Sequence, residues 1–119
     1  MSTCYCDYDM PTVYSRGLPK ARKAYRCDEC NAPIAPGDTY EYVFGVWDGY
    51  PGSHRTCMKC VNLRQWVQNN IPCTCWAHGN LIDDLTASIE DARSRAPEET
   101  RGVWFGYLRR LLPIARRAA

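Results

Sequence analysis

The clearest pattern in the chain is an alternation of apolar and polar residues near its middle. It covers residues 39–47 and has the two-residue period of a β-strand. The apolar positions are Tyr40, Tyr42, Phe44 and Val46. Asp48-Gly49 follows directly and is a strong signal for a tight hairpin turn. The return strand, residues 50–56, contains Pro51, so we expect it to be short or to lie at a sheet edge.

Three later segments repeat apolar residues at helical spacing. The first helix is predicted over residues 57–69, and the second follows Asn80, which can cap its N-terminus. The third begins near Pro97 and ends at Pro113. The apolar positions are Val61, Leu63, Trp66 and Val67, then Leu81, Leu85, Ile89 and Ala92, then Val103, Trp104, Tyr107, Leu108, Leu111 and Leu112.

The segment between Cys6 and Cys27 has no such periodicity. Pro11, Gly17 and Pro19 interrupt it, so we expect an extended arm rather than a helix. Its second half is basic, with Arg16, Lys20, Arg22, Lys23 and Arg26.

The composition indicates that apolar packing alone is too weak to hold these elements together. Hydrophobic residues make up 45% of the 119, but many are Tyr, Ala and Cys, so the aliphatic core is thin and a disulfide or metal is needed. The chain shows neither the features of a signal peptide nor a run of about 20 apolar residues, so we expect a cytoplasmic protein. In that reducing compartment paired cysteines bind metal more often than they form disulfides, although a disulfide scaffold is the alternative.

Two of the four cysteine pairs have the spacing of a zinc site. They are Cys27-x2-Cys30 and Cys57-x2-Cys60. A Cys-x2-Cys knuckle, a hairpin and a second pair opening a helix is the order of a treble-clef zinc finger, whose four thiolates bind Zn²⁺ at about 2.3 Å. Ordinary buried or redox-active thiols are the alternative interpretation.

The outer pairs, Cys4-x-Cys6 and Cys73-x-Cys75, predict a second Zn²⁺ site, which gives two zinc ions in all. This site would tie the N-terminal arm to the segment between two helices. His78 could replace one of its sulfurs; alternatively these cysteines stay as thiols or form a disulfide.

His54 offers another ligand arrangement. His54-x2-Cys57 after the first pair resembles half of a LIM domain, in which His54 would bind the inner metal and Cys60 would pass to the second site. Such a domain needs a further cysteine near position 63, which is Leu63, so Cys60 is the better fourth ligand.

These elements predict an α+β fold: a zinc-stabilised treble clef of knuckle, β-hairpin and helix, followed by a C-terminal pair of helices. Residues 1–119 are expected to form a single zinc-binding domain, with a zinc-organised region at 1–79 and a helical part at 80–119. The formal charge is +2, and two sites of four thiolates around Zn²⁺ would bring it to about −2, which is not the basic excess of a general nucleic-acid binder.

The stretch from Arg22 to Leu63 resembles small uncharacterised zinc-finger proteins of phages and prophages. The residues that carry the resemblance are Cys27-Asp28-Glu29-Cys30, Ile34-x-Pro36-Gly37-x2-Tyr40, Gly45-x-Trp47-Asp48-Gly49 and Thr56-Cys57-x2-Cys60. The start, Cys4-Tyr5-Cys6-Asp7-Tyr8, and the later Cys73-x-Cys75-x2-His78-Gly79 are similar to that group too. The resemblance implies a phage genomic setting and no particular mechanism.

Two functions are compatible with this pattern, and a third, catalysis, is not expected. The first is a non-enzymatic module that binds a host protein, such as a defence or transcription component, through the aromatic anchors Trp47, Tyr50 and Trp76. The alternative is a nucleic-acid-binding zinc finger that uses two basic clusters, one from Arg16 to Arg26 and one formed by Arg109, Arg110, Arg116 and Arg117. We expect no catalysis, because four thiolates close the coordination shell and no zincin, deaminase or phosphate-loop motif is present.

Overall fold

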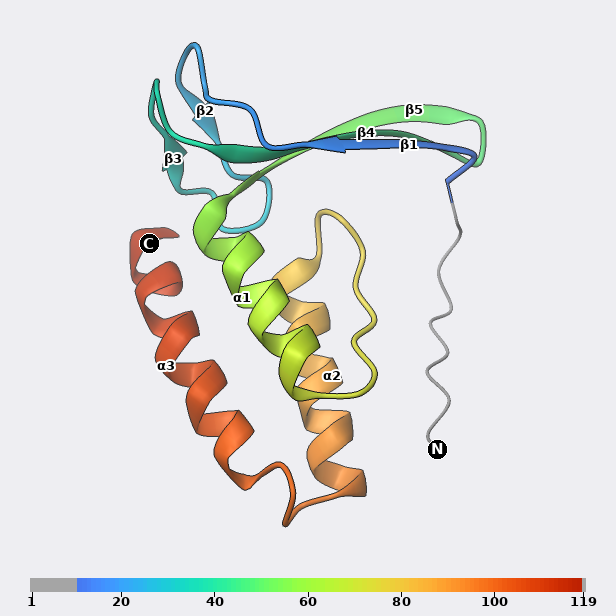
Figure 1. Cartoon of the computed structure of the whole chain (residues 1–119), viewed down its shortest axis with the longest axis vertical. Helices are drawn as coiled ribbons and strands as arrows, with labels where there is room; N and C mark the ends of the chain where they lie inside the picture. The colour runs from blue at the N-terminus through green and yellow to red at the C-terminus, as the bar shows by residue number, and fades with distance from the viewer. Residues whose placement is uncertain (1–10, 119) are drawn as a thin grey trace.

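The chain folds into two small antiparallel sheets and three helices, and the α+β class is confirmed. This computed structural model describes residues 11–118, with side chains described as far as residue 114. The strands are β1 (Val13–Gly17), β2 (Tyr25–Arg26), β3 (Pro33–Ile34), β4 (Tyr40–Trp47) and β5 (Tyr50–Cys57). The helices are α1 (Met58–Asn70), α2 (Leu81–Arg95) and α3 (Arg101–Ala118). The larger sheet lies across one end of the helices (Figure 1).

The predicted hairpin is present and forms the centre of the larger sheet. The sheet has the order β1-β4-β5, and Trp47 pairs with Tyr50 across the turn. Asp48 and Gly49 both have positive φ, at 52° and 80°, as a two-residue turn of this kind requires. The return strand lies at the sheet edge, as expected, but it runs for eight residues and is not short.

Two features go beyond or differ from the sequence prediction. The arm is extended rather than helical, as expected, but it also contains a strand that was not predicted: β1 pairs antiparallel with β4 from Val13↔Val46 to Gly17↔Tyr42. Five exposed residues carry too little alternation to reveal this strand. The third helix continues past Pro113, because Ile114 is 3% exposed and its packing holds the chain helical beyond the lost backbone donor.

The two faces of the larger sheet differ. Glu41 on β4 points toward the helices, is fully buried, and accepts hydrogen bonds from Arg64 of α1 at 2.6 and 3.0 Å and from Arg16 of β1 at 2.6 Å. Burial alone would raise the pKa of Glu41, but the bonds from the two guanidinium groups more than offset it and lower that pKa. This ion-paired carboxylate joins β1, β4 and α1. The opposite face of the sheet has no helix against it among the described residues (Figure 1).

The apolar core lies between the small sheet, the start of α1 and the two later helices. Its largest fully buried side chain is Tyr107 of α3, whose hydroxyl group lies 2.7 Å from the Thr86 hydroxyl on α2. Trp66 of α1 packs against Gly106 of α3. These contacts attach the C-terminal pair of helices to α1.

Glycine at position 45 is required by Trp47. A Cβ atom at Gly45 would lie 2.5 Å from the Trp47 ring and 2.9 Å from the Val13 carbonyl oxygen, whereas one at Gly17 would meet nothing within 4 Å. We predict that Gly45→Ala lowers the free energy of unfolding by about 1–3 kcal/mol, as overpacking does. Gly17→Ala on the neighbouring strand is the matched control and should change it by less than about 0.5 kcal/mol. Urea unfolding measures both, and equal effects would contradict this packing.

Candidate metal centre

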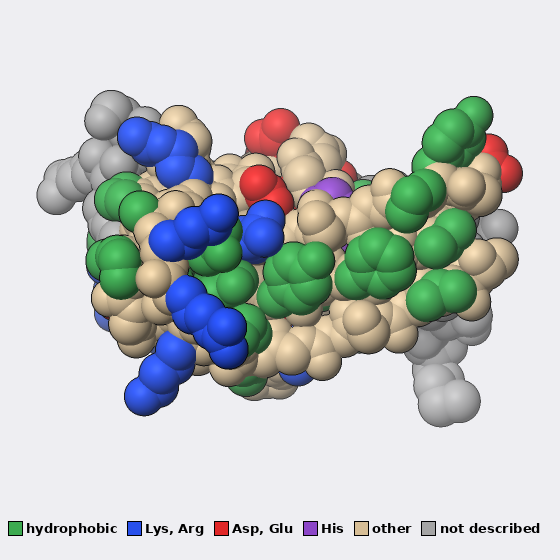
Figure 2. Space-filling model, turned by 90° about the horizontal axis from the view of Figure 1, so that it is seen from above, with side chains coloured by type: hydrophobic (Ala, Val, Ile, Leu, Met, Phe, Trp, Pro, Cys, Tyr) green, Lys and Arg blue, Asp and Glu red, His purple; other side chains and the backbone are tan. Residues whose placement is uncertain are grey.

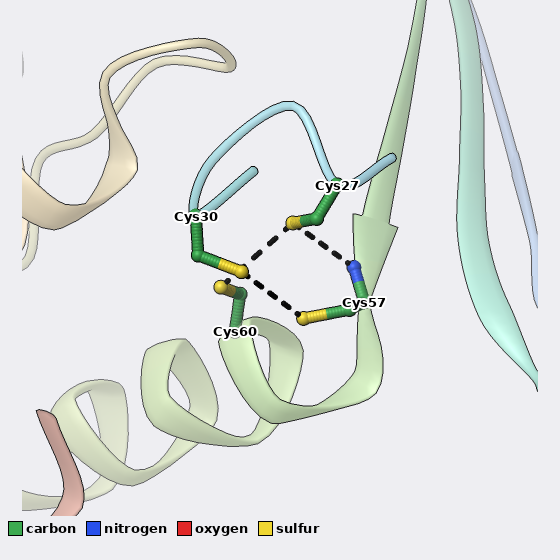
Figure 3. A group of neighbouring side chains, drawn as sticks. All are labelled: Cys27, Cys30, Cys57 and Cys60. Carbon is green, nitrogen blue, oxygen red and sulfur yellow. Dashed lines mark hydrogen bonds between the residues drawn. The ribbon is translucent and has the colours of Figure 1, made fainter. Parts of the chain in front are cut away.

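Four buried cysteines meet where the two sheets and the first helix join. Cys27 and Cys30 flank the turn between β2 and β3, Cys57 ends β5, and Cys60 lies in the first turn of α1. Figure 3 shows their side chains pointing toward one another from these three elements. Segments 30 residues apart in the sequence therefore converge at one point.

The spacing of the four sulfurs fits a tetrahedral metal ion. All four lie within 4.8 Å of one another; the Cys27–Cys60 and Cys30–Cys57 pairs are 3.9 and 3.7 Å apart. Ligands placed tetrahedrally at 2.3 Å from Zn²⁺ are about 3.8 Å from one another. The donor set and its geometry therefore suit a metal that prefers thiolates, and zinc is such a metal.

Backbone donors support negative charge on Cys27. The backbone N–H groups of Glu29 and Cys57 donate to the Cys27 sulfur at 3.4 and 3.3 Å. Hydrogen bonds from the thiols of Cys30, Cys57 and Cys60 hold the pKa of Cys27 well below its usual range. The centre is therefore preorganised for a thiolate, which is the form that binds metal.

The two acidic residues inside the first pair connect the centre to its surroundings. The Asp28 carboxylate accepts the Arg55 backbone N–H at 2.7 Å, which ties the knuckle to β5. The Glu29 carboxylate accepts the N–H groups of Gly79 and Leu81 at 3.3 and 3.4 Å, at the start of α2. Burial raises the pKa of Glu29 to about 7.

This helix start differs from the sequence prediction. Asn80 occupies the N-cap position of α2, but its side chain makes no capping bond and instead donates to Asp84 at 2.9 Å. Glu29 supplies the acceptor from 52 residues away in the sequence. Local sequence rules search the three or four residues around a helix start, so they could not find this partner.

The outer cysteines are placed only in part. Cys73 and Cys75 are both disulfide-bonded in this structure, which is the alternative to metal binding for the outer cysteines, and their two sulfurs lie 3.8 Å apart. The Cys75 backbone N–H donates to Ser88 of α2 at 3.2 Å. Cys4 and Cys6 lie outside the described residues, so the second zinc site stays a prediction.

His54 and His78 lie together and away from the four sulfurs. Their rings stack at 4.8 Å between centroids, and the edge of Trp76 meets His78 at 4.7 Å. Among the described residues, only Cys27, Cys30, Cys57 and Cys60 form a group that could hold a metal ion. The structure therefore gives the inner centre four sulfurs and leaves both histidines in an aromatic cluster.

Burial is the main cause of the lowered pKa of His78. Its Nδ1 atom is buried and has no hydrogen-bond partner in the described part of the chain. Burial first, and then the nearby His54, lower the pKa of His78 to about 4. His78 is therefore neutral at pH 7, and its protonation opposes the folded state.

The three candidate anchors have different environments. Tyr50 is 76% exposed at the hairpin end. Trp47 is partly buried against Gly45 and Gly52, and Trp76 is partly buried between His78 and the Arg64 guanidinium, which lies 4.6 Å from its ring. Only Tyr50 is thus available for contact as a largely exposed ring.

No protein-family model, curated protein or solved structure matches this chain at a significant level. Over the residues that the structure describes, no helix is both long and apolar enough to cross a membrane.

We predict that Cys27→Ser and Cys57→Ser unfold the domain, because a metal bound by these four sulfurs would supply folding free energy on the order of 10 kcal/mol or more. Cys73→Ser is the matched control: it removes at most one ion and keeps the fold. Native mass spectrometry gives the zinc count, its mass under denaturing conditions reports oxidation, and circular dichroism reports folding. A Cys27→Ser protein with native circular dichroism and a full metal load would contradict a structural role.

We also predict that the contribution of His78 to stability falls as the pH decreases from 7.5 to 5.5, by roughly 1 kcal/mol. Glu29, whose pKa burial raises to about 7, contributes with the opposite sign over the same range, so the His78 contribution is measured as the difference from His78→Gln. The unfolded histidine titrates near its ordinary pKa of about 6.5, whereas the folded one titrates at about 4. Protons therefore bind the unfolded chain first. Urea unfolding of the zinc-loaded protein measures this slope, with the zinc content checked at each pH.

His78→Gln should remove this contribution, so its stability relative to the unsubstituted protein should rise by roughly 1 kcal/mol between pH 7.5 and 5.5. His54→Gln should preserve most of it, because burial is the larger cause of the lowered pKa. An unchanged slope in His78→Gln would assign the effect to other groups.

Proposed function

We propose that this chain is a non-enzymatic binding module built on a treble-clef zinc finger with a structural metal. The order of a Cys-x2-Cys turn, the β4–β5 hairpin and a helix that contributes Cys60 supports the treble clef. Four thiolates would fill the tetrahedral shell of Zn²⁺ and leave no position for an activated water. Zinc would then hold the elements together and take no part in a reaction.

The open face of the larger sheet is the observation that carries the binding role. On this face Phe44 is 37% exposed and Val13 is 50% exposed, although both belong to paired strands. Figure 2 shows apolar side chains running along this face, with Lys and Arg side chains gathered at one end. A helix-free face that combines exposed rings with cations is typical of a binding surface rather than a core.

The partner has two candidate classes. A phage setting and a host-protein partner stay hypotheses from the resemblance and the aromatic anchors. Two of those anchors, Trp47 and Trp76, are partly buried in intramolecular contacts, which weakens the support for a protein contact at the hairpin end. The cations on the open face favour the second class, nucleic acid.

A photoreactive side chain tests whether the open face binds anything. We predict that Phe44→p-benzoylphenylalanine forms specific adducts in bacterial extract upon illumination. The same replacement at Phe105 is the matched control, because Phe105 is 64% exposed but lies on α3. Digestion with nuclease or protease identifies the class of each adduct. Equal labelling from both positions, or none from position 44, would contradict a binding role for the sheet.

A further inference from the structure

The open sheet face carries a row of aromatic rings with an arginine among them. Tyr42 and Phe44 lie two positions apart on β4, so both point outward and are separated by about 7 Å along the strand. Arg55 pairs with Tyr42 across the hairpin, and its guanidinium lies 5.2 Å from the Tyr42 ring and 4.3 Å from the Tyr25 ring. The row therefore runs from Tyr25 through Arg55 and Tyr42 to Phe44.

Small residues on both neighbouring strands leave this row uncovered. Ser15 of β1 and Ser53 of β5 lie opposite Phe44. Gly17 lies opposite Tyr42, with no atom within 4 Å of where its Cβ would be. A sheet that buries its aromatic residues surrounds them with other large side chains. This arrangement instead leaves Phe44 exposed and Tyr42 partly exposed to an incoming planar group.

Positive charge adjoins one end of the row. Residues 10–27 contain five Lys or Arg and no Asp or Glu. Four of these cations are exposed and belong to no ion pair within the described part of the chain: Lys20, Arg22, Lys23 and Arg26. Lys23 also lies 5.6 Å from the Tyr25 ring, so rings and cations form one continuous surface (Figure 2).

From this juxtaposition we infer that the open face binds single-stranded nucleic acid, an inference that rests on the proposed binding role of the sheet. Tyr42 and Phe44 stack with successive unpaired bases. Arg55, fixed between two tyrosines, and the four exposed cations contact the phosphates. Aromatic platforms beside a basic track are the general means by which proteins bind single strands without reading sequence.

Unpaired bases distinguish this ligand from a duplex. In double-stranded nucleic acid both faces of each base are stacked, so a flat aromatic row gains contact only with bases that are free of that stack. The cations would attract either form. The aromatic rings therefore make the surface prefer single strands to a duplex, and the cations attract nucleic acid of either form.

Fluorescence anisotropy with the zinc-loaded full chain tests the inference. The probes are labelled oligothymidine and oligouridine of about 20 nucleotides and a duplex of equal length. We expect both single strands to bind more tightly than the duplex. With about five phosphates neutralised, affinity should fall about 130-fold between 50 and 200 mM salt. The DNA and RNA probes show whether the 2′-hydroxyl contributes.

Two matched pairs of variants separate the contribution of the aromatic rings to binding from that of the cations. Phe44→Ala should weaken binding about 5- to 150-fold while keeping the salt dependence, whereas Phe105→Ala on α3 should have no effect. Arg22→Gln with Lys23→Gln should reduce the salt slope by about 1.4, and Arg101→Gln with Arg109→Gln should not. Circular dichroism and zinc content confirm that each variant is folded.

Several outcomes overturn the inference. They are binding unchanged in Phe44→Ala, duplex bound as tightly as single strands, or no binding to any probe by a folded protein. A monomer–dimer equilibrium abolished by Phe44→Ala would assign the face to a second copy of the chain. If position 44 crosslinks a protein but no oligonucleotide binds, the nucleic-acid inference fails and the binding module stands. If it crosslinks nothing, both fail.

Discussion

Four sulfurs converging within 4.8 Å form the junction on which the other contacts in this structure depend. They join the β2–β3 turn, the end of the hairpin and the first turn of α1. The same turn also presents Asp28 to β5 and Glu29 to the start of α2. Fixing Cys27 and Cys30 therefore fixes the direction of the hairpin, of α1 and of α2 together. A metal at this point would act on nearly the whole chain, which is why its loss is expected to unfold rather than loosen the domain.

This junction also explains why one sheet face stays open. The hairpin leaves the junction as a ribbon, and all three helices lie on the side to which Cys57 leads into α1 (Figure 1). The buried Glu41, held by Arg64 and Arg16, attaches the helix-facing side by an ion pair rather than by apolar packing. Breaking such a buried pair would leave an uncompensated charge, so the pair fixes which side of the sheet meets α1. Because the ion pair holds the other face against α1, the face that carries Phe44 is exposed to solvent.

Much of the scaffold could be predicted because its signals are local. The alternation around Tyr42 and Phe44, the Asp48-Gly49 turn and the inner cysteine spacing each lie within a few residues, and the structure confirms the strand, the hairpin and the four-cysteine cluster. The missed features depend on distant partners. β1 forms because it pairs with β4, from Val46 to Tyr42. The first N–H group of α2 donates to the Glu29 carboxylate, and the burial of Ile114 keeps α3 helical beyond Pro113. The cysteines at 4 and 6 lie outside the described residues, so their role is still a prediction.

Net charge is a poor guide to the proposed binding surface, because it takes no account of where the charges lie in the fold. The formal value of +2 averages over the whole chain, and each site of four thiolates around Zn²⁺ would lower it by 2. Charges separated by more than about 10 Å are largely screened at 0.1 M salt, so a ligand responds to the local distribution. Residues 10–27 hold five cations and no acid, and six of the 13 acidic residues belong to the helical segment 80–119. A near-neutral chain can thus present a basic surface, because the fold brings this stretch to one end of the aromatic row (Figure 2).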